Sequence, residues 1–315
     1  MPSEDCRIGV VVITHNRREE LLHTLDHLAA LAERPPIVVV DNASSDDTCT
    51  AVSDRYPEVV LLPQTRNLGA AARTVGVQRI ETEYVALCDD DCRWEQGSLR
   101  LAADLFDRHP RLGLLNARVL VGPKGELDPT CRAMADSPLG CEDGLPGPLL
   151  LGFLAGAAAV RRSAFLECGG FDSRWFLGGE EQLLAVDLAS RGWRLCYVPQ
   201  LVVRHFPSPL RNARDRRRYE LRNALWFAWL RRPWPQAVQK SLQLIRKAPP
   251  RIALEAVALA AAGWPQLWRS RRVVSDEVER GLCQLEAWHA ACQPTTDEQP
   301  LESGQGALSP VVPES

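Results

Sequence analysis

No uncharged apolar stretch of this sequence reaches the roughly 18–20 residues that a membrane-spanning helix requires. The opening residues, MPSEDCRIGVVVITHN, place acids before a short apolar run and carry no cleavage-site pattern, which argues against a secretory signal peptide. We therefore expect a cytoplasmic protein. The apolar run from Ile8 to Ile13 is typical of a buried β-strand instead.

Paired CxxC spacings are also absent, which argues against the common cysteine-based zinc sites. The 10 cysteines are scattered along the chain, so we expect reduced thiols rather than a disulfide framework. No internal repeat is visible. The hydrophobic content of 45% in 315 residues suffices for one large domain or two modest ones.

Charge is unevenly distributed along the chain. The formal net charge is only −3, but residues 204–272 contain 16 Lys and Arg against 3 Asp and Glu, whereas residues 273–315 contain 1 basic residue and 8 acids. Such asymmetry favours a polyanionic partner for the basic segment. Because no recognised nucleic-acid-binding motif accompanies this charge, we do not expect that partner to be a nucleic acid.

Strand-like and helix-like stretches alternate in the first half of the chain. Continuous apolar runs begin near residues 8, 36, 59 and 83, and stretches with helical periodicity, such as 17–33, separate them. This pattern predicts an α/β fold with a mainly parallel sheet. Ligands collect at the carboxyl ends of such strands, where the sequence places Thr14, Asn16, Asp41 and the triplet Asp89, Asp90 and Asp91.

In the second half of the chain, the alternation of strand-like and helix-like stretches changes twice. The pattern loosens between residues 116 and 148, and strands and helices return from 149 to 206, including a helix from about Glu180 to Arg191. Residues 207–292 are Arg-rich and helical. Residues 293–315 are rich in Pro, Glu, Ser and Gly, and we expect them to be disordered.

The three adjacent carboxylates at residues 89–91 repel one another and exceed what helix capping needs. Mg²⁺ and Mn²⁺ favour carboxylate oxygens, and Mg²⁺ uses one or two carboxylates together with phosphate oxygens and water. The triplet therefore predicts a metal–diphosphate site, with a solvated turn as the alternative. Cys88 and Cys92 flank the acids, but thiolates prefer softer ions, so we do not expect them to be ligands.

Six motifs together resemble family 2 glycosyltransferases of the GT-A fold, especially the bacterial rhamnosyltransferase-like members that build cell-surface polysaccharides. The motifs are VVITHNR, VVVDNASSDDT, RNLGAAARTVG, ALCDDDCRW, GGFDSRWFLGGEE and YVPQLVVRHF, from about Arg7 to His205. The resemblance implies a GT-A domain over residues 1–206, with a Rossmann-like nucleotide-sugar-binding half (1–115) and an acceptor and catalytic part (116–206). Its sheet would be mixed, mainly parallel and flanked by helices. Residues 207–292 then form a helical extension, and 293–315 a tail.

The resemblance also implies roles for the strand-end residues in binding the sugar donor. Asp41 matches the acid that binds the base or ribose, with an Asx-turn cap as the alternative. Thr14, Asn16 and Arg17 would line the same pocket. Asn67 and Gly69 match an N-x-G loop in which glycine lets the backbone approach the ligand, and Arg66 or Arg73 would meet the diphosphate.

The DxD motif of the family maps to Asp89 and Asp91, with Asp90 between them as a further donor-binding residue. Asp91 is the expected direct ligand of Mg²⁺ or Mn²⁺, and Asp89 would meet the ribose or a metal-bound water. His205 would complete the metal site, or else cap a strand or bond a phosphate. The metal neutralises the departing nucleoside diphosphate.

The resemblance places the acceptor and the base in GGFDSRWFLGGEE. Trp175 and Phe176 would stack on a sugar face, with core packing as the alternative. Glu181 stands where the family carries an Asp base and is longer by one methylene, so Glu180 is a second candidate. Leu183 replaces a further acid that is often present, which keeps a non-catalytic nucleotide-sugar-binding or scaffold protein at the membrane as an alternative. A sugar nucleotidyltransferase is disfavoured because THNRREE lacks the glycines of a triphosphate loop.

The basic segment mixes Arg clusters with aromatic residues: Trp226, Phe227, Trp229, Trp234, Trp264 and Trp268. This mixture is typical of helices at an anionic membrane surface, and a helical cap on the core is the alternative. We therefore expect an inverting glycosyltransferase with a nucleotide-diphosphate sugar donor and a glycan or lipid-linked acceptor. It would be cytoplasmic and peripheral on the inner face of the cytoplasmic membrane.

Overall fold

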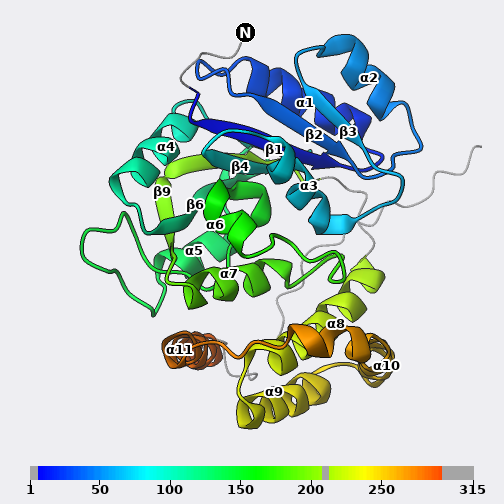
Figure 1. Ribbon diagram of the computed structural model, residues 1–315, viewed down its shortest axis with the longest axis vertical. Helices are drawn as coiled ribbons and strands as arrows, with labels where there is room; N and C mark the ends of the chain where they lie inside the picture. The colour runs from blue at the N-terminus through cyan, green and yellow to red at the C-terminus, as the bar shows by residue number, and fades with distance from the viewer. Residues whose placement is uncertain (1–5, 208–212, 293–315) are drawn as a thin grey trace, which may run out of the picture.

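A computed structural model describes residues 6–207 and 213–292 of the chain, and its architecture is an α/β sheet with helices on both faces and a helical bundle at one end (Figure 1). The strands are β1 (Ile8–Thr14), β2 (Ile37–Asp41), β3 (Val60–Pro63), β4 (Tyr84–Asp89), β5 (Cys92–Trp94), β6 (Leu112–Val121), β7 (Glu126–Leu127), β8 (Ala158–Arg161) and β9 (Arg194–His205). They form one sheet in the order β3-β2-β1-β4-β8-β6-β9-β5, with β7 paired to β6.

The helices follow the strands in the first two-thirds of the chain and are consecutive thereafter. They are α1 (Arg18–Ala29), α2 (Thr48–Arg55), α3 (Ala72–Arg79), α4 (Ser98–Arg108), α5 (Pro129–Ala135), α6 (Arg162–Glu167), α7 (Glu180–Ser190), α8 (Ala213–Arg231), α9 (Trp234–Lys247), α10 (Pro250–Leu267) and α11 (Asp276–Cys292). Short 3₁₀ turns lie at η1 (Gly69–Ala71), η2 (Ala155–Ala157) and η3 (Trp268–Ser270).

The first four strands are parallel, as their continuous apolar runs predict. Their register aligns Thr14 with Asp41 on one side, and on the other aligns Ile13 with Asp89. The carboxyl ends of β1, β2 and β4 therefore meet at one edge of the sheet. We call this the acidic edge and define it by Thr14, Asp41, Asp89, Asp90 and Asp91.

The chain turns sharply inside the acid triplet. β4 ends at Asp89, and β5 begins at Cys92. β5 pairs antiparallel with β9, and Cys92 is opposite His205 in this pairing. The Phe206 amide donates to the Asp91 carbonyl at 2.8 Å, which fixes the end of β9 beside the triplet. Antiparallel pairing of β8 with β4 and β6 makes the sheet mixed, as the fold prediction required.

The helices after residue 212 lie beyond α7 on the side away from the sheet (Figure 1). They share an apolar core with α7 and the loop before it, whose fully buried members include Trp175, Val186, Trp226, Leu267 and Leu282. Shared burial of this kind joins the extension to the sheet domain. The predicted division near residue 206 falls beside residues 208–212, and the predicted tail, 293–315, lies outside the described residues.

Within residues 6–207 and 213–292, no helix has the length and apolarity needed to cross a bilayer. All ten cysteines fall within these ranges, and none of them is paired in a disulfide.

Candidate active site

Two residues of the acidic edge, Asp90 and Asp91, have buried side chains. The Asp90 carboxylate accepts hydrogen bonds from the Thr14 hydroxyl and from Arg17, both at 2.9 Å. Burial raises the pKa of Asp90 to about 7, although the Arg17 guanidinium opposes the rise. Thr14 and Asp90 are both buried. They position the turn, and their role in the donor pocket stays a prediction.

Asp91 lies between two groups from distant parts of the chain. Its carboxylate is 3.4 Å from the Arg17 guanidinium and 3.5 Å from the His205 imidazole. The β5–β9 register produces the second contact, because Cys92 pairs with His205 and Asp91 precedes Cys92. The structure thus brings together the two residues that we expected to be the main metal ligands.

Carboxylate and imidazole at this position fit a divalent cation. Ligand atoms of Asp91, Cys92 and His205 all lie within 4.8 Å of one another. Burial raises the pKa of the Cys92 thiol well above its ordinary value, so the thiol stays protonated. The remaining oxygen and nitrogen ligands fit Mn²⁺ or Mg²⁺ with water and phosphate oxygens completing the shell.

Asp89 is the most exposed acid of the triplet and contacts a different cation. Its carboxylate forms an ion pair with Arg73 of α3, whose side chain is buried. Gly156 of η2 packs against the same carboxylate, because a Cβ there would lie 2.7 Å from Asp89 Oδ2. Arg73 therefore contacts the acid triplet directly, whereas Arg66 is exposed.

Asp41 forms the Asx-turn cap that was the alternative considered from sequence, and its donor-binding role stays a prediction. One carboxylate oxygen accepts from the Ser44 amide at 2.9 Å, which is the Asx-turn cap. Its other oxygen, Oδ1, is buried and has no hydrogen-bond partner among the described residues. An unsatisfied buried carboxylate oxygen is costly, and a donor group of a bound nucleotide would satisfy it.

Asparagines hold the loops around the acidic edge. Asn16 has a positive φ of 52°, and its side chain accepts from the Ser45 amide at 2.7 Å. Asn42 accepts from the Leu68 amide at 3.0 Å and donates to the Gly69 carbonyl at 3.2 Å. Asn67 accepts from the Gly69 amide at 2.8 Å, closing its own turn. The expected N-x-G loop is therefore tied to the end of β2.

Gly69 is required by a protein contact. Its φ is +61°, and a Cβ would lie 2.1 Å from the Phe176 carbonyl oxygen. The same carbonyl accepts from the Ala70 amide at 2.8 Å. The backbone that approaches Gly69 belongs to residues 171–179, which we call the 171–179 loop, and a ligand contact at Gly69 stays a prediction.

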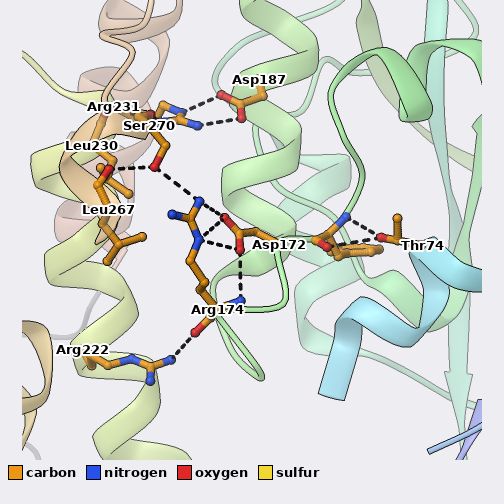
Figure 2. Close-up of polar contacts among 10 residues, drawn as sticks. Thr74, Asp172, Arg174, Asp187, Arg222, Leu230, Arg231, Leu267 and Ser270 are labelled. Carbon is orange, nitrogen blue, oxygen red and sulfur yellow. Dashed lines mark hydrogen bonds and ion pairs between the residues drawn. The ribbon is translucent and has the colours of Figure 1, made fainter. Parts of the chain in front are cut away.

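The 171–179 loop is held from two sides (Figure 2). On one side the Phe171 amide donates to the Thr74 hydroxyl of α3 at 2.8 Å. On the other side, Arg222 of α8 donates to the Arg174 carbonyl at 3.3 Å, and Arg174 donates to the Ser270 hydroxyl at 3.3 Å. Both the sheet domain and the helical extension therefore set the position of this loop.

Asn223 of α8 makes the densest set of contacts with the loop. Its amide nitrogen lies 3.0, 3.1 and 2.5 Å from the carbonyl oxygens of Trp175, Leu177 and Gly178. Its oxygen accepts from Arg222, and the side chain is fully buried. A buried amide satisfied in this way fixes the backbone that leads into α7.

Trp175 does not present a ring face for sugar stacking. It is 1% exposed and packs edge-on against Trp226 of α8 with ring centroids 6.1 Å apart. The core-packing alternative is therefore the observed one, because the indole fills the core shared by α7 and α8. Phe176 is half-buried, has a positive φ of 59° and contacts Tyr219, so it remains a candidate for acceptor contact.

Glu180 and Glu181 open α7 in different environments. Glu180 is 3% exposed, and burial, reinforced by the charge of Glu181, raises its pKa to about 8. Glu181 is half-buried and lines a pocket of about 540 Å³. Burial alone would lower the pKa of Arg73, but the charges of Asp89, Glu181 and Glu180 outweigh it and raise that pKa. Arg73 therefore links the acid triplet electrostatically to both glutamates.

The pocket beside Glu181 is lined by both parts of the chain. Leu150, Leu151 and Phe153 come from the sheet domain, and Phe227, Lys240 and Leu282 come from the extension. Arg232 at this pocket is paired with Glu279 at 2.7 Å and Glu286 at 2.6 Å. The pocket can therefore receive an amphipathic molecule with one end at Glu181.

Three residues of the site were not predicted. Asn42 lies in the predicted motif VVVDNASSDDT, and Gly156 lies just before β8. Only the folded structure shows which residues they contact. Asn223 follows an Arg cluster that charge patterning assigned to the surface, so its sequence context carried no signal for burial.

The family model "Glycosyl transferase family 2" matches residues 9–169, just over half of the 315 residues. An N-acetylglucosaminyl-diphospho-decaprenol L-rhamnosyltransferase of Mycobacterium tuberculosis is 32% identical over 233 residues, which cover 63% of this chain and 75% of the relative. Neither the family model nor this relative supports the alternatives of a scaffold protein or a sugar nucleotidyltransferase.

Two solved structures are similar in fold. A mannosyltransferase, PcManGT from Pyrobaculum calidifontis in complex with GDP-Man and Mn²⁺, has a TM-score of 0.56 at 20% identity and covers 91% of this chain and 81% of its own. S. aureus TarS 1–349 in complex with UDP has a TM-score of 0.52 at 17% identity, covering 93% and 94%. The chain therefore belongs to glycosyl transferase family 2 and is a nucleotide-sugar-dependent glycosyltransferase with a GT-A fold.

Proposed function

We propose that this protein is an inverting, metal-dependent transferase that moves a hexosyl or deoxyhexosyl group to a lipid-linked glycan acceptor at the inner face of the cytoplasmic membrane. The observation that carries the proposal is that Asp91 lies beside His205 while its neighbour Asp89 pairs with Arg73, whose pKa the charge of Glu181 also raises. The relative named as an L-rhamnosyltransferase of a diphospho-decaprenol-linked sugar supports an acceptor of this class.

Donor binding is assigned to the acidic edge and its loops. Asp41 Oδ1 would accept from the base or ribose, and Asn16, Arg17 and Asn67 would complete the pocket. Asp91 and His205 would hold Mn²⁺ or Mg²⁺, with Asp89 on the ribose or a metal-bound water. The bound cation would neutralise charge on the departing diphosphate.

Glu181 is assigned as the general base. Its carboxylate would take the proton from the acceptor hydroxyl. The acceptor oxygen then forms a bond to the anomeric carbon, and the bond from that carbon to the diphosphate oxygen breaks with its electron pair leaving on the nucleoside diphosphate. Attack opposite the leaving group inverts the anomeric configuration. The pocket that Glu181 lines would hold the acceptor.

Thermal denaturation with ligands tests donor and metal binding together. UDP, GDP and dTDP would each be added with and without Mn²⁺, and we expect one of them to raise the melting temperature only when Mn²⁺ is present. Asp91→Ala should lose this shift, whereas Asp54→Ala, on the exposed face of α2, should keep it. Mass spectrometry of a polyprenyl-diphosphate-linked acceptor incubated with the matching nucleotide sugar then tests transfer. Absence of every nucleotide-dependent shift would contradict the proposal.

A further inference from the structure

Exposed large apolar side chains concentrate on the outer helices of the extension. α9 exposes Trp234, Val238, Leu242 and Ile245, and α10 with η3 exposes Leu254, Val257, Leu259 and Trp268. The α9 residues recur at helical spacing and define one face. Leu254, at 73% exposure, is the most exposed large apolar residue of the described chain. Exposed apolar side chains gathered on one helix face, as on α9, are typical of an interaction site.

Tryptophans join the two helices. Ring centroids are 5.5 Å apart for Trp229 and Trp234, 5.6 Å for Trp234 and Trp268, 5.2 Å for Trp268 and Trp264, and 5.8 Å for Trp264 and Trp229. The four indoles thus form a closed ring that connects the start of α9 to the end of α10. Trp234 and Trp268 are 50% and 43% exposed, and indoles favour the membrane–water boundary.

Positive charge surrounds this apolar surface. Arg246, Lys247, Arg251, Arg269 and Arg272 are exposed. Between residues 221 and 275 the sequence contains one acid, Glu255, which is 3.3 Å from Arg251 in an ion pair. Apolar side chains bordered by cations complement an anionic lipid surface, where each basic residue contributes about 1 kcal/mol.

We propose that α9, α10 and η3 form a docking face for an anionic phospholipid bilayer. The exposed Trp, Leu and Ile side chains enter the boundary between headgroups and acyl chains, and the Arg and Lys side chains contact the headgroup phosphates. Lys240 and Leu244, on the side of α9 away from this face, line the pocket that contains Glu181, so docking would hold the pocket one helix diameter, about 10 Å, from the surface that carries a lipid-linked acceptor. This last consequence rests on the proposed function, whereas lipid binding itself does not.

Vesicle flotation of the full chain tests the docking face. Vesicles of phosphatidylcholine alone are compared with vesicles containing 30% phosphatidylglycerol at about 0.1 M salt, where surface charge is only partly screened. We expect binding to the anionic vesicles, little binding to the neutral ones, and release by high salt. Equal binding to both, or to neither, would overturn the proposal.

Matched variants locate the face. Leu254→Glu should lower the partition coefficient at least tenfold, whereas Leu127→Glu, at another exposed leucine on β7, should not. Arg246→Glu with Lys247→Glu should also lower it at least tenfold, whereas the exposed control pair Arg79→Glu with Lys124→Glu should not. Equal losses in variants and controls would place the lipid contact elsewhere and overturn the assignment.

Two further measurements separate this proposal from its rivals. Size-exclusion chromatography that finds a dimer in the wild type and a monomer in Leu254→Glu, without vesicle binding, would make the face an interface between copies and overturn lipid docking. Vesicle-free hydrolysis of the nucleotide sugar should be the same in the wild type and Leu254→Glu. Vesicle binding without any sugar transfer would contradict the proposed function and leave the docking face standing.

Discussion

The acidic edge and the 171–179 loop are built in opposite ways. Thr14, Asp41 and Asp89 occupy the ends of neighbouring parallel strands, so their proximity follows from strand register alone. The loop depends on contacts with Asn223, more than forty residues later in the chain. A site at strand ends can be predicted from local sequence, whereas a loop held by a distant helix cannot. The two regions should therefore respond differently to substitution.

The largest effect should come from the acidic edge. Asp91→Asn removes the charge between His205 and Arg17 while keeping the shape of the side chain. We expect transfer to fall by about a thousandfold or more, because charge stabilisation of a leaving diphosphate is worth several kcal/mol. Initial rates with Mn²⁺ present check this, and circular dichroism checks the fold. Transfer within tenfold of the wild type would remove Asp91 from the metal site.

The next effect should come from Glu181, which follows the 171–179 loop at the start of α7. Glu181→Gln should lower kcat about 10²–10⁴-fold, the usual contribution of a general base, with nucleoside diphosphate affinity unchanged. Glu181→Asp should retain activity, because the carboxylate is kept. Steady-state kinetics measure both variants. If Glu180→Gln shows this loss of kcat and Glu181→Gln stays active, the base is Glu180.

A smaller effect should come from the helix that holds the 171–179 loop. Asn223→Ala removes the side-chain donor of the Leu177 and Gly178 carbonyls, whereas the Trp175 carbonyl keeps Arg222 as a donor, and we expect a cost of about 1–3 kcal/mol. We expect a lower melting temperature and a roughly tenfold lower kcat/KM for acceptor, because the loop beside the acceptor pocket is displaced.

Nucleoside diphosphate affinity separates this positioning role from general damage. It should be unchanged in Asn223→Ala, because the acidic edge does not use this residue. Gln239→Ala, at an exposed amide of α9, is the control and should change neither quantity. Equal losses of donor and acceptor binding in Asn223→Ala would indicate that the two regions are not separable.

The smallest effect concerns pH. Burial and the neighbouring charge of Glu181 raise the folded-state pKa of Glu180 to about 8 from its ordinary value of 4.5. The folded state therefore holds a proton that the unfolded state releases above about pH 4.5, so this group favours folding at low pH. That contribution declines as pH rises from about 4.5 to about 8 and changes no further above that.

Glu180→Gln should remove this slope, since glutamine does not titrate. Melting temperatures measured from pH 5.5 to 8.5 should therefore fall less with pH in Glu180→Gln than in the wild type, by a few degrees across the range. A wild-type slope that persists in the variant would assign the pH dependence to another group.

The sequence predicted the sheet and most of the acidic edge for a physical reason. Apolar runs specify buried parallel strands, and the polar residues that end them must then meet at one edge. His205 lies beside Asp91, as the family resemblance implied, because β5 pairs with β9.

The sequence predicted the other half of the site less well. Trp175 was a candidate for sugar stacking, yet it lies in a core completed by Trp226, and a tryptophan in a Gly-rich segment looks the same in both cases. The Arg-rich sequence around Asn223 likewise gave no sign that Arg222 and Asn223 turn inward. Tertiary packing decided both positions, and single-residue preferences carry little information about it.

The contact between Gly69 and Phe176 has a consequence for altering this enzyme. The Phe176 carbonyl fills the space that a side chain at residue 69 would need, and the Ala70 amide donates to that carbonyl. Segments 66–70 and 171–179 therefore behave as a single cassette. A chimaera that takes only one of these segments from another transferase would introduce a steric clash at residue 69 or leave the Ala70 amide without its acceptor. Chimaeras designed to change specificity should therefore replace both segments together.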